Sequence, residues 1–191
     1  MQVLAFSDIH GRWDILRSIV KKRADLYICL GDLTYGELGI EEASKILEPV
    51  FDRLLCVPGN NERLQTMQRY FPLVLHGNTW EYKGIRFGGI GGSPRTPFHT
   101  IHEWDEGDAE TLLARMGRVD VLLSHTPPAG THLSITRSGV DAGSKAIREY
   151  ILSFKPKLVL CGHVHERAGE EDRLGDTRII NPGPWGKYVE L

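Results

Sequence analysis

The feature that most constrains this chain is a short apolar run that recurs five times. The runs are rich in Val, Leu and Ile, each leads directly into a residue able to bind a metal ion, and they occupy residues 3–7, 25–31, 54–59, 119–124 and 157–162. Near-continuous apolar runs of this length are typical of strands that are buried on both faces. The runs therefore predict a set of parallel strands inside an α/β fold.

Segments with helical spacing lie between several of these runs and predict the crossovers that parallel strands require. Apolar residues three or four positions apart predict a helix near residues 12–24 and another near 143–154. Leu112, Leu113 and Met116 indicate a shorter helix. These apolar stripes are expected to pack against the core.

Further strands are predicted outside the repeated runs. Residues 79–90 resemble two strands that turn at Lys83-Gly84, and residues 177–180 and 187–191 predict two more. The length of 191 residues suits one well-buried domain, so residues 1–191 are expected to form a single domain. The residues predict an α/β sandwich with some antiparallel additions.

Composition and charge argue against several classes of protein. The chain is 41% hydrophobic and 25% charged, which is typical of an ordinary soluble globular protein. A net charge of -2 gives no reason to expect nucleic acid as a partner. The N-terminus lacks the features of a signal peptide and no segment is apolar enough to span a membrane, so we expect a cytoplasmic protein without a membrane partner. The oligomeric state stays open, a homo-oligomer included.

The residues that follow the apolar runs predict a metal centre. Ligands of open α/β sheets bind beyond the carboxyl ends of the strands, where loops converge. Seven residues are candidates for both metal binding and catalysis: Asp8, His10, Asp32, Asn60, His125, His163 and His165. Two carboxylates, one amide oxygen and four imidazoles suit two divalent ions of Mn, Fe, Zn, Co or Ni, with Mn favoured, better than calcium.

The order of these motifs carries more weight than any one of them. The series Asp8-x-His10, Gly31-Asp32, Gly59-Asn60-x-Glu62, Ser124-His125 and Gly162-His163-x-His165 resembles the calcineurin-like metallophosphoesterase family. The resemblance implies a four-layer αββα sandwich, in which two sheets are flanked by helices, and a binuclear metal centre. By similarity, Asp8, His10 and His165 would hold the first metal, Asn60, His125 and His163 the second, and Asp32 would bridge the two.

Two divalent cations at such a site would make hydroxide available near neutral pH, and that hydroxide is the expected nucleophile. Four positive charges against two carboxylates leave a formal balance of about +2, which favours a phosphate anion. We therefore predict a binuclear phosphoesterase that hydrolyses a small phosphoester, with phosphodiesters favoured, and that needs no covalent intermediate.

Substrate contacts are less well defined by the sequence. Arg12 directly follows the first ligand motif and is the first choice among the nearby arginines, which include Arg95. Residues 91–107 and 126–142 are rich in Gly, Pro, Thr and His and are expected to be long loops that set substrate choice. The candidates for shaping the pocket within these loops are His99, His102 and His132.

The sequence departs from the family pattern after Asn60. Asn61 stands where the family commonly has a histidine that assists departure of the leaving group. Asn61 either contacts substrate or caps the following helix, and Glu62 either caps that helix or supports the metal ligands. An amide cannot replace an imidazole as a general acid, so poor leaving groups are expected to react slowly.

Two other functions stay in competition with the phosphodiesterase. Some members of the family keep the fold while the metal site has degenerated, and such a chain would be a non-catalytic interaction scaffold. The presence of all seven ligand types argues against a scaffold here. Other relatives process DNA, but the bulk charge and the lack of a basic aromatic tract argue against a nuclease.

Overall fold

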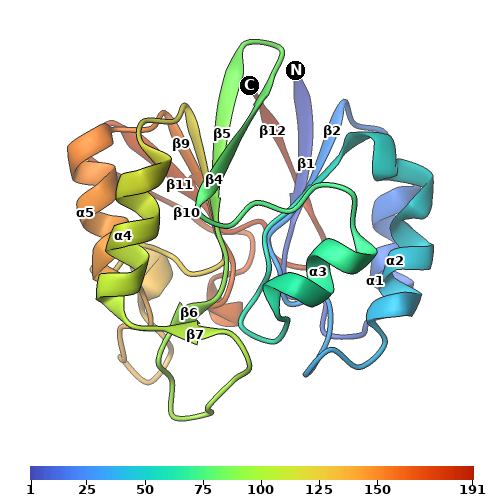
Figure 1. The fold of residues 1–191 in the computed structure, drawn as a ribbon, viewed down its shortest axis with the longest axis horizontal. Coiled ribbons are helices and arrows are strands. Elements are labelled where there is room, and N and C mark those ends of the chain that lie inside the picture. The colour runs from blue at the N-terminus through green and yellow to red at the C-terminus, as the bar shows by residue number, and fades with distance from the viewer.

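The computed structural model describes residues 1–191 as two sheets packed face to face, with helices on both outer faces (Figure 1). The first sheet has the order β12-β1-β2-β3 and comprises β12 (Lys187–Glu190), β1 (Gln2–Phe6), β2 (Leu26–Cys29) and β3 (Leu54–Cys56). The second has the order β10-β11-β9-β8-β5-β4 and comprises β10 (Glu171–Leu174), β11 (Thr177–Ile180), β9 (Leu158–Leu160), β8 (Val121–Ser124), β5 (Ile85–Ile90) and β4 (Asn78–Tyr82).

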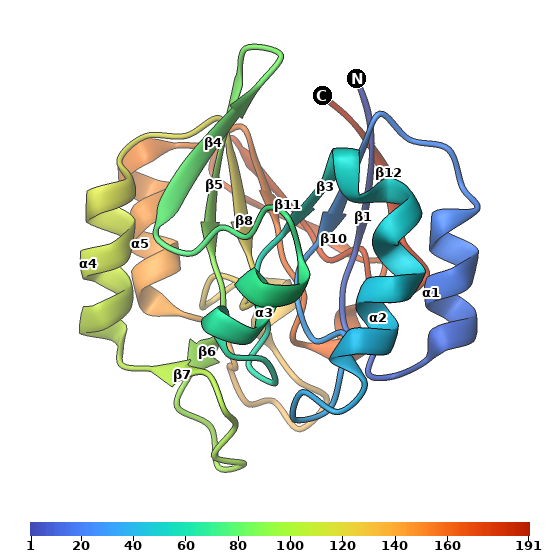
Figure 2. The same cartoon turned by 45° about the vertical axis from the view of Figure 1, so that its right-hand side comes forward.

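The helices divide between the two sheets. The first sheet is covered by α1 (Trp13–Val20), α2 (Ile40–Leu47) and α3 (Leu64–Tyr70), with the 3-10 helix η1 (Glu48–Arg53) between the last two. The second sheet is covered by α4 (Glu106–Met116) and α5 (Lys145–Phe154), which pack side by side in both views (Figure 2). The result is the expected αββα order of layers.

Three apolar cores separate the four layers. Along β1, Val3 and Ala5 belong to the core between the sheets, whereas Leu4 and Phe6 belong to the core under α1 and α2. Successive side chains of a strand point to opposite faces, so a strand buried on both faces must be apolar at every position. This explains the near-continuous apolar runs of the sequence.

The parallel strands place their carboxyl ends at one edge of the sandwich. β1, β2 and β3 are parallel neighbours, and so are β5, β8, β9 and β11. The antiparallel additions are β4, β10 and β12, each at the edge of its sheet. The loops after the parallel strands therefore meet beneath both sheets, on the side away from the two chain termini (Figures 1 and 2).

The predicted elements are present with a few differences. The strands on both sides of Lys83-Gly84 are confirmed as β4 and β5, and the tail strands as β11 and β12. The helix marked by Leu112, Leu113 and Met116 was predicted to be short, which is wrong, because α4 spans 11 residues. Its first turn carries the acidic residues Glu106 and Asp108, which obscure the apolar stripe.

Several elements have no counterpart in the prediction. α3 and β10, with 7 and 4 residues, contain few apolar side chains. α2 has 8 residues and an apolar face of Ile40, Ala43, Ile46 and Leu47, which the prediction missed. Residues 91–107 include β6 (Ser93–Pro94) and β7 (Glu103–Trp104), and residues 126–142 include the 3-10 helix η2 (His132–Ser134). None of the helices has the length and apolar character needed to cross a membrane.

Candidate metal centre

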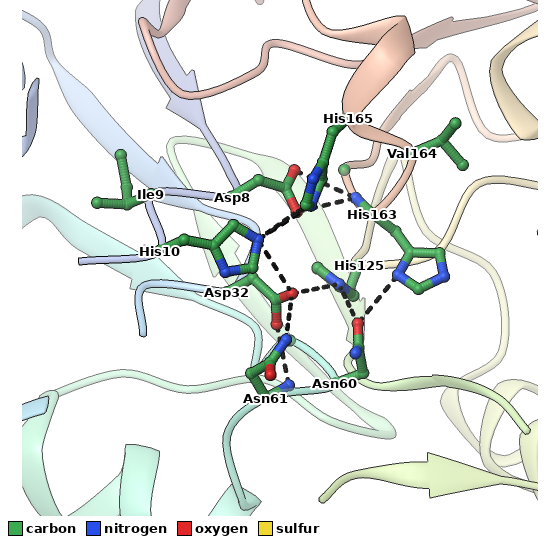
Figure 3. A network of polar contacts seen from close by, with 12 residues as sticks. Asp8, Ile9, His10, Asp32, Asn60, Asn61, His125, His163, Val164 and His165 are labelled. Atoms are coloured by element: carbon green, nitrogen blue, oxygen red, sulfur yellow. Dashed lines mark hydrogen bonds and ion pairs between the residues drawn. The ribbon is translucent and has the colours of Figure 1, made fainter. Parts of the chain in front are cut away.

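The seven predicted ligands meet at the carboxyl ends of the parallel strands (Figure 3). Asp8 and His10 follow β1, and Asp32 follows β2. The loop after β3 supplies Asn60, β8 leads into His125, and the turn after β9 supplies His163 and His165, the latter opening the 3-10 helix η3 (His165–Arg167). Segments more than 150 residues apart in the chain thus contribute to one cluster.

The first part of the cluster consists of Asp8, His10, Asp32 and His165, whose ligand atoms all lie within 4.8 Å of one another. Nε2 of His10 lies 2.9 Å from Nε2 of His165 and 3.6 Å from Oδ2 of Asp32. Nε2 of His165 is also 3.5 Å from Oδ1 of Asp8. The two imidazoles and two carboxylates converge on a space of the size that one divalent cation occupies.

The second part consists of Asn60, His125 and His163. Oδ1 of Asn60 lies 2.9 Å from Nε2 of His125 and 2.9 Å from Nδ1 of His163. Oδ2 of Asp32 lies 3.6 Å from Nε2 of His125, the same distance that separates it from Nε2 of His10. One oxygen of Asp32 therefore faces both parts of the cluster (Figure 3).

Backbone contacts set the orientation of two imidazoles. Nδ1 of His125 donates to the carbonyl of Leu30 at 2.7 Å, and Nδ1 of His10 lies 3.3 Å from the carbonyl of Thr34. In the neutral imidazole a proton on Nδ1 leaves a lone pair on Nε2. Both Nε2 atoms face the cluster, which is the arrangement found in metal-ligating histidines whose other nitrogen is held by a carbonyl.

The backbone is strained at the cluster. Of the eight non-glycine residues with positive φ, four belong to the cluster, namely Asp8, His10, Asp32 and His163. Such conformations cost on the order of 1–3 kcal/mol each and persist where surrounding contacts enforce them, often at functional sites. A Cβ on Gly59 would lie only 1.9 Å from Oδ1 of Asp32, so the loops after β2 and β3 can approach this closely only with glycine there.

Glu62 holds these two loops together. Its buried carboxylate accepts hydrogen bonds from the backbone N–H groups of Asp32, Thr34 and Gly59 at 2.9–3.1 Å. Burial, and then the neighbouring carboxylate of Asp32, raise the pKa of Glu62 to about 7. The predicted alternative that Glu62 caps a helix is wrong, because α3 begins two residues later, at Leu64, and the N-cap position is held by Arg63, which makes no side-chain cap.

The cluster perturbs the ionisation of its own members. Burial lowers the pKa of His10, and burial together with nearby His125 lowers the pKa of His163 to about 4. Burial disfavours ionisation of Asp8, but the hydrogen bond from His165 and the nearby imidazoles of His125 and His165 together outweigh it and hold the pKa of Asp8 well below its usual value. The same hydrogen bond raises the pKa of His165. His10 and His163 are thus neutral and available as ligands at neutral pH.

The predicted substrate contacts are not all at the cluster. Arg12 is bound to its own turn, since its guanidinium donates to the carbonyls of Ile9 and Asp8. The side-chain amide of Asn61 donates to Oδ2 of Asp32 at 2.7 Å, and its backbone N–H donates to Oδ1 at 3.0 Å. The predicted alternative that Asn61 caps α3 is therefore wrong. Of Arg12 and Asn61, only Asn61 lines the cleft above the cluster.

The three loop histidines lie away from the cleft. His99 is exposed, and His132 is exposed and pairs with Glu170 at 2.8 Å. His102 is half-buried against His76, at 4.9 Å between ring centroids, and its backbone N–H donates to the carbonyl of Asn60. None of the three lines the cleft.

The cleft has a volume of about 740 Å³ and is formed by the cluster and two loops. Residues 94–100 and 136–143 contribute most of the remaining lining. Sequence reasoning placed these loops beside the cluster but missed Tyr35, Phe98 and Val140, which are 61%, 84% and 59% exposed and line the cleft. Phe98 and Val140 could have been identified as large apolar residues within predicted functional loops.

The cluster fits divalent cations. Nε2 of His10 and Nε2 of His165 lie 2.9 Å apart and both face carboxylate oxygens, so a proton or a cation is needed among these atoms. The mixed nitrogen and oxygen donors suit transition metals. The side chain of His10 is only 5% exposed and that of His165 is 54% exposed, so a cation would be enclosed on one side and open to the cleft on the other.

Comparisons with known proteins find one similar sequence and several similar folds. The chain is 32% identical to the uncharacterized protein MJ1162 of Methanocaldococcus jannaschii over 199 residues, covering 99% of this chain and 91% of that protein. Its fold is similar to that of TT1561 of Thermus thermophilus, with a TM-score of 0.73, 19% identity, and coverage of 95% of this chain and 88% of the other. It is also similar to that of the phosphopantetheinyl hydrolase PptH of Mycobacterium tuberculosis, with a TM-score of 0.68, 13% identity, and coverage of 98% and 95%.

The family is shown by a match over most of the chain. The sequence profile described as calcineurin-like phosphoesterase matches residues 1–167, a span that includes all seven residues of the cluster. The motifs, the αββα layers and the Asp/His cluster agree with that match. The chain is therefore a member of the calcineurin-like phosphoesterase family.

Proposed function

We propose that this chain is a phosphodiesterase that binds two divalent cations. Asp8, His10 and His165 would hold one cation, Asn60, His125 and His163 the other, and Asp32 both. The observation that carries the proposal is the position of Oδ2 of Asp32, 3.6 Å from Nε2 of His10 in the first group and 3.6 Å from Nε2 of His125 in the second. An oxygen shared in this way supports a bridging ligand.

Bound cations would supply the Lewis acidity that makes hydroxide available near neutral pH and neutralises charge on the phosphate oxygens. The protein's own groups orient the site. The carbonyls of Leu30 and Thr34 hold His125 and His10, and Glu62 holds the backbone of Asp32. The amide of Asn61, 2.7 Å from Oδ2 of Asp32, faces the cleft and is positioned to donate to a phosphate oxygen.

A diester is favoured over a monoester by the charges that line the cleft. A monoester dianion carries one more negative charge than a diester at neutral pH. Arg95 is the only lysine or arginine that lines the cleft, and its guanidinium is paired with Asp105 at 2.6 Å. The cleft therefore has no free basic side chain that could bind the second negative charge of a monoester. Manganese is the first cation to test.

The proposal is tested by measuring cation content and hydrolysis together. We expect wild-type protein to bind about two cations per chain and to hydrolyse bis(p-nitrophenyl) phosphate faster than p-nitrophenyl phosphate. Asp32→Asn and His125→Ala should each lower kcat/KM by at least about 10²-fold and reduce the cation content, since loss of one ligand weakens the site. Elemental analysis and a chromogenic assay provide the two readouts.

Asp52→Asn is the matched control for Asp32→Asn, because Asp52 is an exposed carboxylate on η1, outside the cleft. It should retain both cation content and activity. Wild-type protein that binds no cation in the presence of Mn, Fe, Zn, Co or Ni would contradict the proposal. A cation-loaded protein that hydrolyses no phosphoester would instead favour the scaffold function.

A further inference from the structure

The outer part of the cleft combines polar residues with a set of apolar side chains, whereas the cluster at its base is polar. Its apolar lining comes from separate loops and consists of Tyr35, Pro94, Pro97, Phe98, Val140 and Ala142. A volume of about 740 Å³ lies in the range of sites for drug-sized molecules, and a phosphate group alone would fill a small part of it. The space beyond the cluster is therefore large enough for an organic group of the substrate.

Two aromatic rings at this cleft are exposed. One face of the Tyr35 ring stacks on His10, with ring centroids 4.3 Å apart and planes inclined by 18°, yet the residue is 61% exposed. Phe98 is 84% exposed and belongs to no apolar core. Single exposed apolar residues are ordinary. Here Tyr35, Phe98 and Val140 come from three loops and line the same cleft as the cluster, so an organic group bound in the cleft could reach all three.

The charged groups of the outer cleft are mainly acidic. Asp141 and Glu166 line the outer cleft. Arg95 is the only lysine or arginine of the lining, and it is paired with Asp105. Glu166 accepts a hydrogen bond from the backbone N–H of Arg137 at 3.2 Å. An additional anionic group on the substrate would be repelled there, whereas a neutral or cationic group would not.

We propose that the outer cleft is a subsite for a flat aromatic group, uncharged or cationic, esterified to the phosphate on the side opposite the leaving group. The ring would pack against Tyr35, Phe98 and Val140 while the phosphate occupies the cluster. This inference rests on the proposed function. The subsite would favour phosphodiesters whose retained group is aryl over those whose retained group is alkyl or carries a second anionic charge.

The subsite is tested with phosphodiesters that share p-nitrophenol as leaving group and differ in the retained group. With the manganese-loaded enzyme, the phenyl ester should exceed the methyl ester in kcat/KM by about 10–100-fold, as expected for burial of an aromatic ring. Phe98→Ala should lower that ratio by about 2–10-fold, the range expected for loss of one aromatic contact. Equal kcat/KM values for the two esters in wild type would overturn the subsite.

A matched control is available on a different face of the molecule. Leu152 on α5 is 44% exposed and does not line the cleft, so Leu152→Ala also removes an exposed apolar side chain. It should leave the phenyl-to-methyl ratio unchanged. An equal fall of the ratio in Leu152→Ala and Phe98→Ala would show that the effect is not specific to the cleft and would overturn the proposal.

The charge preference is tested with a carboxyphenyl ester of the same series. Wild type should hydrolyse it more slowly than the phenyl ester, and Glu166→Gln should narrow that difference by about threefold, the effect of one charge at roughly 6 Å in water. The amide oxygen of this variant would still accept the N–H of Arg137, as Oε1 of Glu166 does. A carboxyphenyl ester hydrolysed faster than the phenyl ester would overturn the charge part of the proposal.

Failure of the subsite and failure of the proposed function give different results. If the cation-loaded protein hydrolyses none of the esters, the proposed function fails, and the subsite is still tested by calorimetric binding of diphenyl and dimethyl phosphate. Tighter binding of diphenyl phosphate that Phe98→Ala weakens supports the subsite. A dimer that Phe98→Ala dissociates, seen by sedimentation, would assign this surface to a second copy of the chain and overturn the proposal.

Discussion

At the scale of single residues, we expect Asn61 to limit which leaving groups this site can expel. Its amide is bound to Asp32, and His99, His102 and His132 do not line the cleft, so none of these histidines is positioned to act as the missing acid. We expect kcat/KM to fall steeply as the pKa of the leaving group rises. Asn61→His should raise kcat/KM for alkyl esters by about 10²-fold by supplying a general acid.

The measurement is kcat/KM across a series of leaving groups for wild type, Asn61→His and Asn61→Ala. Asn61→Ala removes the amide without adding an acid, so it should not improve alkyl esters. A flat dependence in wild type would show that another group already protonates the leaving group, and the role assigned to residue 61 would then be wrong.

The imidazoles also predict how the site responds to acid. Contact with Asp8 raises the pKa of His165, whereas burial lowers the pKa of His163 to about 4. A raised pKa means that His165 binds its proton first as the pH falls, and a proton there competes with a cation. Hence the cation held by Asp8, His10 and His165 should dissociate at higher pH than the one held by His163.

This prediction is checked by elemental analysis after dialysis at a series of pH values. Cation content should fall from two to one between about pH 7 and 5 and decline further toward pH 4, where His163 also becomes protonated. The loss of activity should coincide with the loss of the first cation. Simultaneous release of both cations, or full occupancy at pH 4, is the result that this account does not allow.

At the scale of elements, the loops after β5 and β8 were expected to set substrate choice, and the structure limits which parts can do so. Buried Trp104 donates to the carbonyl of Gly91 at 2.8 Å, and the backbone of His102 bonds that of Asn60. The inner part of the first loop is thus structural. Residues 95–100, by contrast, lie at the cleft with mostly exposed side chains.

We therefore expect a Gly/Ser linker in place of residues 95–100 to change substrate preference while cation content is retained. Preference for the phenyl over the methyl diester should fall by about 10-fold, since the apolar contacts of the loop are lost. Replacement of the whole of 91–107 should instead lower the cation content and the midpoint of urea unfolding. Loss of cations in the shorter replacement would show that the outer loop is structural as well.

At the scale of the whole molecule, charge argues against polyanionic substrates. The net charge is -2, and Asp141 and Glu166 add acidic groups at the cleft itself. Nucleic-acid binding depends on lysine and arginine that neutralise phosphates. We expect single-stranded and double-stranded DNA to remain intact, with digestion at least about 10³-fold slower per phosphodiester than bis(p-nitrophenyl) phosphate under the same conditions. Robust cleavage with added manganese would favour the nuclease function.

The sequence by itself determined the α/β class, the parallel strands and the seven residues of the cluster. Strands buried on both faces are apolar throughout, and each of these strands is followed by a polar residue. The apolar run and the polar residue after it are local features, so both can be recognised along the chain. The order of the motifs was distinctive enough to indicate the family. Local patterns therefore sufficed for β1, β2, β3, β8 and β9.

Only the tertiary structure decided how distant residues meet. One oxygen of Asp32 faces both His10 and His125, and Glu62 ties two loops rather than capping a helix. Both features depend on contacts between segments about 20 to 90 residues apart. The meeting of Tyr35, Phe98 and Val140 at one cleft is also decided by the tertiary structure, because these residues share no pattern in the sequence. Spacing along a chain specifies periodicity within an element, whereas the distance between loops depends on how the sheets pack.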